Sequence, residues 1–230
     1  AGAMRKAEEI TCAGITSMMK ASKPGMYEYQ YKAVFDYAIG QYGPQGPGFP
    51  SIISAGKNNF CIHYYSYKGQ AHDGDMVLND VGAWHDYVMT DVSRGWPCNG
   101  KFNERQALLY NIALETSNHM FSLIKPGMPM KDVDGESHRY CAQLLKDAGV
   151  LDEVGNIGKY MWHGGAHHVA LTSMTPWRRR KSLPQHGVLR GHRHLSRGVG
   201  HRLPGGGQLP GDPGRLREPF CPDAPHHPGD

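Results

Sequence analysis

Apolar side chains recur at helical spacing in four stretches of the chain. A period of about 3.6 residues is typical of helices that bury one face. A Lys-Pro-Gly sequence follows the first and the third stretch, at 23–25 and 125–127, and Gly149 follows the fourth. Each of these ends a helix. We therefore expect helices over residues 4–22, 28–42, 104–124 and 131–148. No capping residue precedes the first, so we expect the chain to begin inside a longer protein.

Shorter apolar runs predict strands between and after these helices. Residues 51–65 have the pattern of a strand, a turn at 56–59 and a second strand. Another strand begins at Met76, and a last one is expected within 159–171. The order of helices, strands, helices and strand indicates the α+β class, because a parallel sheet would alternate strands with helices.

The composition of the chain changes near residue 171. Residues 1–171 carry 15 basic and 17 acidic side chains, whereas residues 172–230 carry 10 basic and 4 acidic ones. The net charge of +4 therefore arises in the tail, which also has 19 Gly and Pro among its 59 residues and no Tyr or Ile. Such composition is typical of disorder. We expect a folded domain over 1–171 and a disordered, Arg/Gly/Pro-rich tail over 172–230.

These counts also restrict the class of protein. No apolar run reaches the roughly 18 residues that a membrane helix needs, and no signal peptide is visible, which predicts a cytoplasmic protein without a membrane partner. Five cysteines, an odd number without a CxxC pair, favour free thiols. A nucleic-acid partner is not expected, because its binding would depend on the basic tail. That tail has only Trp177 and Phe220 as aromatic residues on which bases could stack.

Two aspartates have the spacing of a candidate metal site. Asp80 and Asp91 lie eleven residues apart, one on each arm of an expected hairpin. Carboxylates that converge across a hairpin can share a divalent cation. The alternative is structural: Asp80 would cap a turn, and Asp91 would pair with Arg94.

Histidines supply the second candidate group. His163, His167 and His168 lie within six residues, around two glycines that let the backbone approach a ligand closely. Neutral imidazole is the usual nitrogen ligand of divalent metals. The alternative is a histidine-rich loop with one histidine in the core. His63 stands alone in an apolar stretch and is by itself more typical of a structural residue.

Taken together, these stretches resemble the pita-bread metallopeptidases, a group that includes aminopeptidase P, prolidase and methionine aminopeptidase. The resemblance covers residues 4–171 and is carried by GDMVLNDVGA, YVMTDVSRGWPCNGKF, IKPGM and HGGAHH. It is greatest to the Xaa-Pro aminopeptidase and prolidase branch. It implies an α+β pita-bread fold, of which residues 1–171 would form the N-terminal three-quarters of a catalytic domain.

The resemblance also implies roles for single residues. Asp80, Asp91 and His167 match metal ligands, and His63 and His163 match histidines that bind the substrate and the tetrahedral intermediate. His168 matches a variable position. Two divalent ions are implied, manganese first, with cobalt or zinc as alternatives. The implied reaction releases the first residue of a peptide whose second residue is proline. A prolidase acting on Xaa-Pro dipeptides and a metal-free binding protein remain alternatives, and the oligomeric state, a homo-oligomer included, stays open.

The tail departs from the family pattern. The family site has two further acidic ligands and a second histidine seven residues after the ligand histidine, where this chain has Met174. Codons for 172–175, read with one added G, can spell Asp-Val-His-Asp. Codons for 185–220, read one base later, can spell a string containing VDIGIY and RVEDN, which resemble the missing acidic motifs. We therefore predict that 172–230 is an out-of-frame translation and that this chain lacks two of five ligands.

Overall fold

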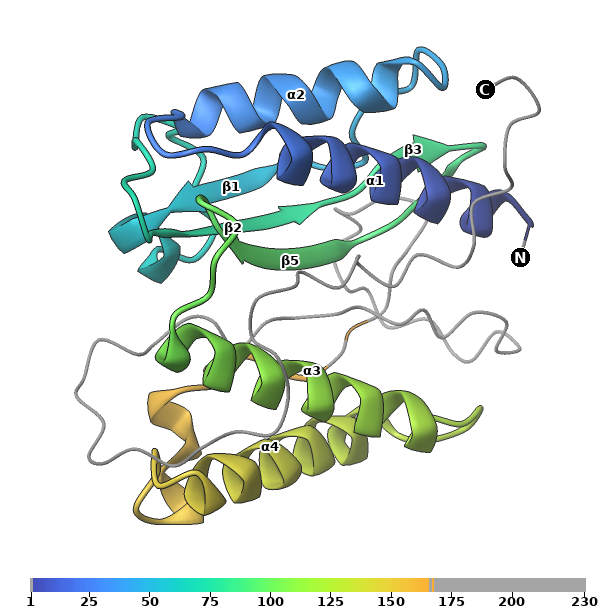
Figure 1. Ribbon diagram of the computed structural model, residues 1–230. Helices are drawn as coiled ribbons and strands as arrows, with labels where there is room; N and C mark the ends of the chain where they lie inside the picture. The colour runs from blue at the N-terminus through green and yellow to red at the C-terminus, as the bar shows by residue number, and fades with distance from the viewer. Residues whose placement is uncertain (1, 166, 168–230) are drawn as a thin grey trace.

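The computed structural model describes residues 2–165 and 167 (Figure 1). Two helices, α1 (Gly2–Ala21) and α2 (Glu28–Gly40), pack side by side and cover one face of a sheet. The sheet has three antiparallel strands in the order β1 (Ile52–Ala55), β2 (Met76–Val81) and β5 (Val92–Pro97). A short 3-10 helix, η1 (Gly56–Phe60), follows β1, and a two-stranded hairpin of β3 (Trp84–His85) and β4 (Val88–Met89) connects β2 to β5.

Side chains alternate between the two faces of this sheet. In the pairing of β2 with β5, Val77 lies opposite Trp96 and Val81 lies opposite Val92. These four residues belong to the core beneath α1 and α2, together with Phe35 and the other members of that cluster. Because successive strand residues point to opposite faces, Leu78 and Asp80 belong to the other face. Helices α1 and α2 cover the hydrophobic face of the sheet, so Asp80 lies on the opposite face.

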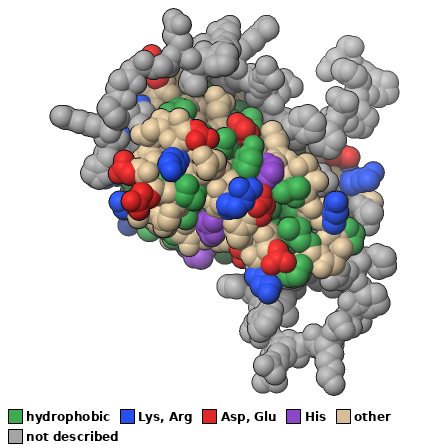
Figure 2. Space-filling model, turned by 90° about the horizontal axis from the view of Figure 1, so that it is seen from below, with side chains coloured by type: hydrophobic (Ala, Val, Ile, Leu, Met, Phe, Trp, Pro, Cys, Tyr) green, Lys and Arg blue, Asp and Glu red, His purple; other side chains and the backbone are tan. Residues whose placement is uncertain are grey.

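A pair of helices forms the second layer, on the side of the sheet away from α1 and α2 (Figure 1). Asn103 begins α3 (Glu104–Leu123) with a capping box, in which its side chain accepts from the amide of Gln106 at 2.9 Å. α4 (Met130–Asp147) packs against α3 and against the 3-10 helix η2 (Val154–Lys159). Their shared core contains Ile112, Cys141 and Leu145. Seen from below, acidic and basic side chains are interspersed on this layer (Figure 2).

The four helices expected from the sequence are confirmed to within a few residues at each end. The expected second strand after the turn at 56–59 is wrong: residues 61–69 form an irregular surface loop in which His63 and Tyr67 have positive φ. That backbone conformation is incompatible with a strand. Residues 160–165 also contain no strand, and residues 168–171 lie outside the described part of the chain.

The expectations about cysteines and membrane helices can be compared only with the residues that the structure describes. Cys61, Cys98 and Cys141 are free thiols, as expected. No helix of residues 2–165 has the length and apolar character needed to cross a membrane. His168, Met174 and the whole tail 172–230 lie outside the described residues.

Candidate metal centre

Asp80 and Asp91 lie on adjacent arms of one hairpin, residues 76–97, which we call the aspartate hairpin. Asp80 is directly opposite Ser93, whose hydroxyl donates a 2.8 Å hydrogen bond to its carboxylate. Asp91 lies one residue before β5 and two before Ser93, so the alternation of the strand, continued by one residue, puts it on the face of Ser93. Such diagonal neighbours are roughly 7–8 Å apart. The register thus includes Asp80, and Asp91 lies just before the first paired residue of β5.

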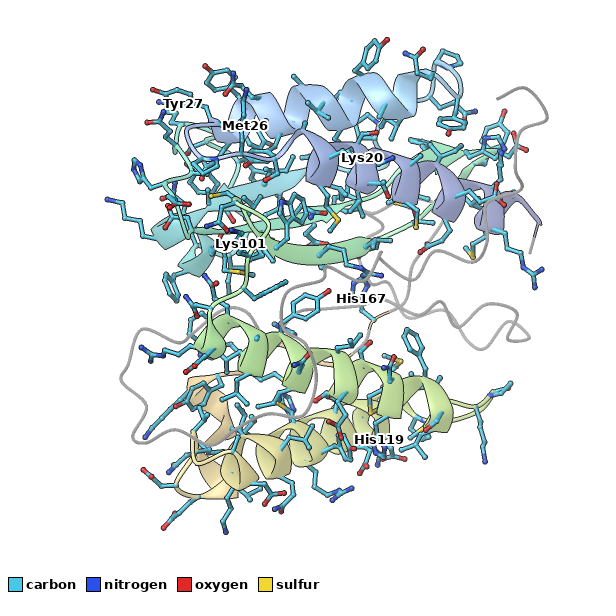
Figure 3. All side chains as sticks on the ribbon, viewed as in Figure 1. Lys20, Met26, Tyr27, Lys101, His119 and His167 are labelled. Carbon is cyan, nitrogen blue, oxygen red and sulfur yellow. The ribbon has the colours of Figure 1, made fainter. Side chains whose placement is uncertain are left out.

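His167 reaches the aspartate hairpin from the far end of the described chain. Its Nε2 lies 2.9 Å from Oδ2 of Asp91, and the Asp91 side chain is 16% exposed. In Figure 3 the His167 side chain lies between the sheet and α3. The structural alternative for Asp91 placed Arg94 as its partner, but Arg94 instead donates to the carbonyl of Ser93 at 2.8 Å. Two of the three predicted ligands are therefore in direct contact.

Close backbone packing supports the aspartate hairpin. A Cβ atom on Gly82 would lie 1.8 Å from the carbonyl oxygen of Thr90, so only glycine fits there. The Thr90 hydroxyl lies 2.6 Å from that of Thr11, a fully buried residue of α1. The Thr11 hydroxyl also accepts the amide of Ala83 at 2.8 Å. Helix α1 therefore holds the turn of the chain between the two aspartates.

His163 lies in the segment that leads to His167, of which residues 161–165 and 167 are described and which we call the His163 loop. It is half-buried, and its Nδ1 lies 2.8 Å from the carbonyl oxygen of Gly164. If that nitrogen carries the proton, Nε2 is left as an acceptor, and a protonated ring would donate from both nitrogens. His163 and His167 therefore belong to one short loop, while Asp80 and Asp91 belong to the sheet.

His63 lies on the exposed loop of residues 61–69, the His63 loop. Its φ is 56°, and its ring stacks on Tyr65 with centroids 6.4 Å apart. Within residues 2–165 and 167 it makes no hydrogen bond or ion pair with Asp80, Asp91 or His167. A non-glycine residue with positive φ costs free energy and persists where the surroundings enforce it, as is common at functional sites.

The group that enforces the His63 loop is Glu28, which the sequence analysis missed. Its side chain is fully buried at the start of α2. One carboxylate oxygen accepts from the amide of Ala55 at 2.8 Å and from the side chain of Asn58 at 2.9 Å. The other accepts from the amide of Gly69 at 2.7 Å. A buried carboxylate is stable when such donors surround it, and here they come from both ends of the loop.

Tyr64 extends this network toward the loop tip. Its hydroxyl accepts a 3.1 Å hydrogen bond from Asn58. Burial raises the pKa of Tyr64, and the carboxylate of Glu28 raises it further. The neighbour of His63 is thus connected to Glu28 through one side chain. A glutamate in the first turn of a helix gives no sequence signal of this role, since acidic residues are common there.

The donor set suits a divalent ion but does not surround a common point. Two carboxylates and one imidazole are oxygen and nitrogen ligands of the kind that manganese, cobalt and zinc accept. Among residues 2–165 and 167, however, no three His, Cys, Asp or Glu side chains are arranged to hold a metal ion. Asp80 is hydrogen-bonded to Ser93, and Asp91 is paired with His167. The predicted ligands thus adjoin one another, without forming a closed site.

The chain is similar to known metallopeptidases. Residues 2–195 match the model of metallopeptidase family M24. The chain is 32% identical over 148 residues to the Xaa-Pro aminopeptidase of Escherichia coli, which covers 64% of this chain and 34% of that protein. It is also 32% identical over 149 residues to the mitochondrial intermediate cleaving peptidase 55 of Arabidopsis thaliana, with 64% and 30% coverage. The chain spans about a third of the length of these relatives.

Solved structures extend the likeness to the fold. Zinc-substituted E. coli aminopeptidase P in complex with product is similar with a TM-score of 0.70 and 30% identity. The likeness covers 74% of this chain and 40% of that one. A structure attributed to an aminopeptidase P of Bacillus anthracis gives a TM-score of 0.72 at 32% identity, with 75% and 41% coverage. The expected pita-bread fold is confirmed, and the chain belongs to metallopeptidase family M24.

Proposed function

We propose that this chain is part of a metal-dependent aminopeptidase that releases the N-terminal residue from peptides with proline in the second position. The observation that carries the proposal is the 2.9 Å contact between Asp91 and His167, with Asp80 on the same face of the sheet. The names of the relatives, Xaa-Pro aminopeptidase and aminopeptidase P, support the choice of substrate.

In this proposal Asp80, Asp91 and His167 hold two divalent ions, manganese by preference and cobalt or zinc as alternatives. Such ions, when bound, supply a water that is ionised near neutral pH and polarise the scissile carbonyl. His163 in its protonated form, with Nδ1 donating to the Gly164 carbonyl, would donate from Nε2 to the carbonyl oxygen and stabilise the developing negative charge. His63 would bind the substrate from the opposite loop, where its exposed side chain is accessible. Two acidic ligands are still required.

We further propose that the required acidic ligands belong to the reading frame that residues 172–230 have lost. Residues 1–171 would then be the N-terminal three-quarters of the catalytic domain, and 172–230 a frameshifted tail. Sequencing the DNA that codes residues 168–186 tests this directly. Confirmation of the present frame in error-free reads would exclude a sequencing error.

The enzyme proposal is tested with the present chain and with a frame-restored version. Both are assayed on a proline-second tripeptide with Mn²⁺ and again after chelation. We expect turnover from the restored chain, lost on chelation, and little from the present chain because its ligand set is incomplete. D91N in the restored chain should abolish turnover. A folded restored chain that neither binds Mn²⁺ nor cleaves the tripeptide would favour the metal-free alternative, and cleavage of Xaa-Pro dipeptides alone would favour a prolidase.

A further inference from the structure

The His163 loop is held against helix α4 by a carboxylate. Oδ1 of Asp134 accepts a 2.7 Å hydrogen bond from the backbone amide of Gly165. Asp134 lies one turn inside α4 and is half-buried. A hydrogen bond to an ionised acceptor is roughly twice as strong as one between neutral groups. This bond therefore fixes the backbone of the loop at one defined point.

The two glycines of the loop allow this close approach. A Cβ atom on Gly164 would lie 2.6 Å from Oδ1 of Asp134, and one on Gly165 would lie 2.1 Å from the hydroxyl of Ser137. Ser137 is itself buried, and its hydroxyl donates to the carbonyl of Asp134 at 2.9 Å. The surface of α4 at Asp134 and Ser137 is thus complementary to a pair of glycines and to no larger residue.

Anchoring Gly165 restricts where His167 can lie. Two residues span at most about 7 Å of extended chain, so the backbone of His167 stays within that distance of the anchor. Asp134 belongs to the helical layer, whereas Asp91, the partner of His167, belongs to the sheet layer. Figure 3 shows His167 between these two layers. The loop is therefore supported from α4 while its histidine contacts the sheet.

We infer that Asp134 is a positioning residue for the candidate metal centre: by fixing Gly165 it places His167 against Asp91. The part of this inference that concerns metal affinity rests on the proposed function, in which His167 is a ligand. Groups hydrogen-bonded to the ring of a metal-binding histidine typically contribute 10–100-fold to metal affinity, and we take this range as the upper expectation for Asp134. Asp134 has this role through the backbone, without contacting the ion or the substrate.

The chain offers a matched control in Asp132. This residue is exposed, lies in the first turn of α4 and carries the same charge two positions earlier. Replacing it with alanine removes the same charge from the same end of the helix, where the helix dipole acts on both carboxylates. The variant D134N adds a second comparison, because its amide oxygen can still accept the Gly165 N–H.

The experiment uses the full chain and its D134A, D134N and D132A variants. Hydrogen exchange of the segment 161–167 and binding of Mn²⁺ are measured for each. We expect D134A to speed exchange of this segment by about tenfold, the effect of losing one charged hydrogen bond, and to weaken Mn²⁺ binding by roughly 10–100-fold. D134N should lie between D134A and the unsubstituted chain, and D132A should match the latter.

Two results would overturn the inference. One is unchanged exchange of 161–167 in D134A, and the other is faster exchange with unaltered Mn²⁺ affinity. If the unsubstituted chain binds no Mn²⁺, the proposed metal function fails for this chain, and the exchange of 161–167 alone decides whether Asp134 holds the loop. If D134A loses its helical circular dichroism, the variant has unfolded. The same two measurements on D134N, which retains an acceptor, then decide the question.

Discussion

The aspartate hairpin and the His63 loop present their functional candidates in opposite ways. In the hairpin, Asp80 lies on regular, paired backbone and Asp91 directly precedes the paired strand β5, so the register largely determines where the two aspartates lie. In the His63 loop, the backbone is irregular and strained, and a buried carboxylate 27 residues before Ala55 in the chain holds it. Regular structure gives precise placement with few side chains, whereas a loop requires a polar network to define it. The two regions should therefore fail differently when altered.

The largest effect is expected for Gly82→Ala in the aspartate hairpin. The added Cβ would lie 1.8 Å from the Thr90 carbonyl oxygen, a backbone atom that no side-chain rotation can move away. We expect a loss of more than about 4 kcal/mol in the free energy of unfolding, enough to unfold a marginal domain. Urea denaturation measures it. Gly135→Ala is the control, since nothing lies within 4 Å of its Cβ; a hairpin that tolerates Gly82→Ala would contradict its dependence on backbone contact.

A smaller effect, confined to the other region, is expected for Glu28→Ala. The variant leaves the amides of Ala55 and Gly69 without their acceptor and removes one of the two acceptors of the Asn58 side chain. A buried donor left unpaired costs about 1–3 kcal/mol, so we expect roughly 3 kcal/mol of destabilisation after relaxation.

Hydrogen exchange tells whether this loss is local. Amides of 61–69 should exchange faster in Glu28→Ala, while those of the aspartate hairpin should keep most of their protection. Glu9→Ala serves as control, because Glu9 forms only an exposed pair with Lys6 among the described contacts, and such pairs contribute at most about 1 kcal/mol. Equal loss of protection in both regions would contradict the expectation that Glu28 stabilises the His63 loop and not the aspartate hairpin.

Thr11→Val tests how far α1 contributes to the aspartate hairpin. The change keeps the shape of the side chain but removes the hydroxyl that accepts the Ala83 amide and contacts Thr90. We expect a loss of about 1–2 kcal/mol, since buried polar groups lose their partner. Thermal unfolding of Thr11→Val and of Thr16→Val, a half-buried position on the same helix, gives the comparison. Equal melting temperatures of the two variants would show that the Thr11 hydroxyl of α1 does not stabilise the aspartate hairpin.

The smallest effect on stability is expected from a change in pH, and it concerns neither the aspartate hairpin nor the His63 loop. Hydrogen bonds from Arg139 and His119 lower the pKa of Glu136 from 4.5 to about 2. Because the folded pKa is below the unfolded one, the carboxylate stabilises the native state above pH 4.5, and this contribution is lost as the pH falls from about 4.5 to 2.

The variant Glu136→Gln should therefore flatten the pH dependence of the urea midpoint in this window. The hydrogen-exchange protection of the aspartate hairpin and the His63 loop should stay unaltered by the change, since Glu136 lies in the helical layer. An unchanged acid dependence in Glu136→Gln would show that the ion pair with Arg139 is screened by solvent.

The helices and the aspartate pair could be predicted from the sequence because their signals are local. Helical periodicity identifies all four helices, two of which end at Lys-Pro-Gly, and the spacing of Asp80 and Asp91 fits a hairpin. The second strand after residue 60 could not be excluded, since residues 61–65 combine residue types that also occur in strands. The reason it does not form lies in Glu28, more than thirty residues earlier.

The sequence by itself determined the family, the four helices, and which side chains are candidate ligands. These features depend on periodicity, turn residues and motif spacing, which are properties of neighbouring residues. Only the tertiary structure decided that His167 contacts Asp91, that Asp134 anchors Gly165, and that Glu28 organises the His63 loop. Each of these contacts joins residues far apart in the chain, and their donors and acceptors pair only after the layers have packed together.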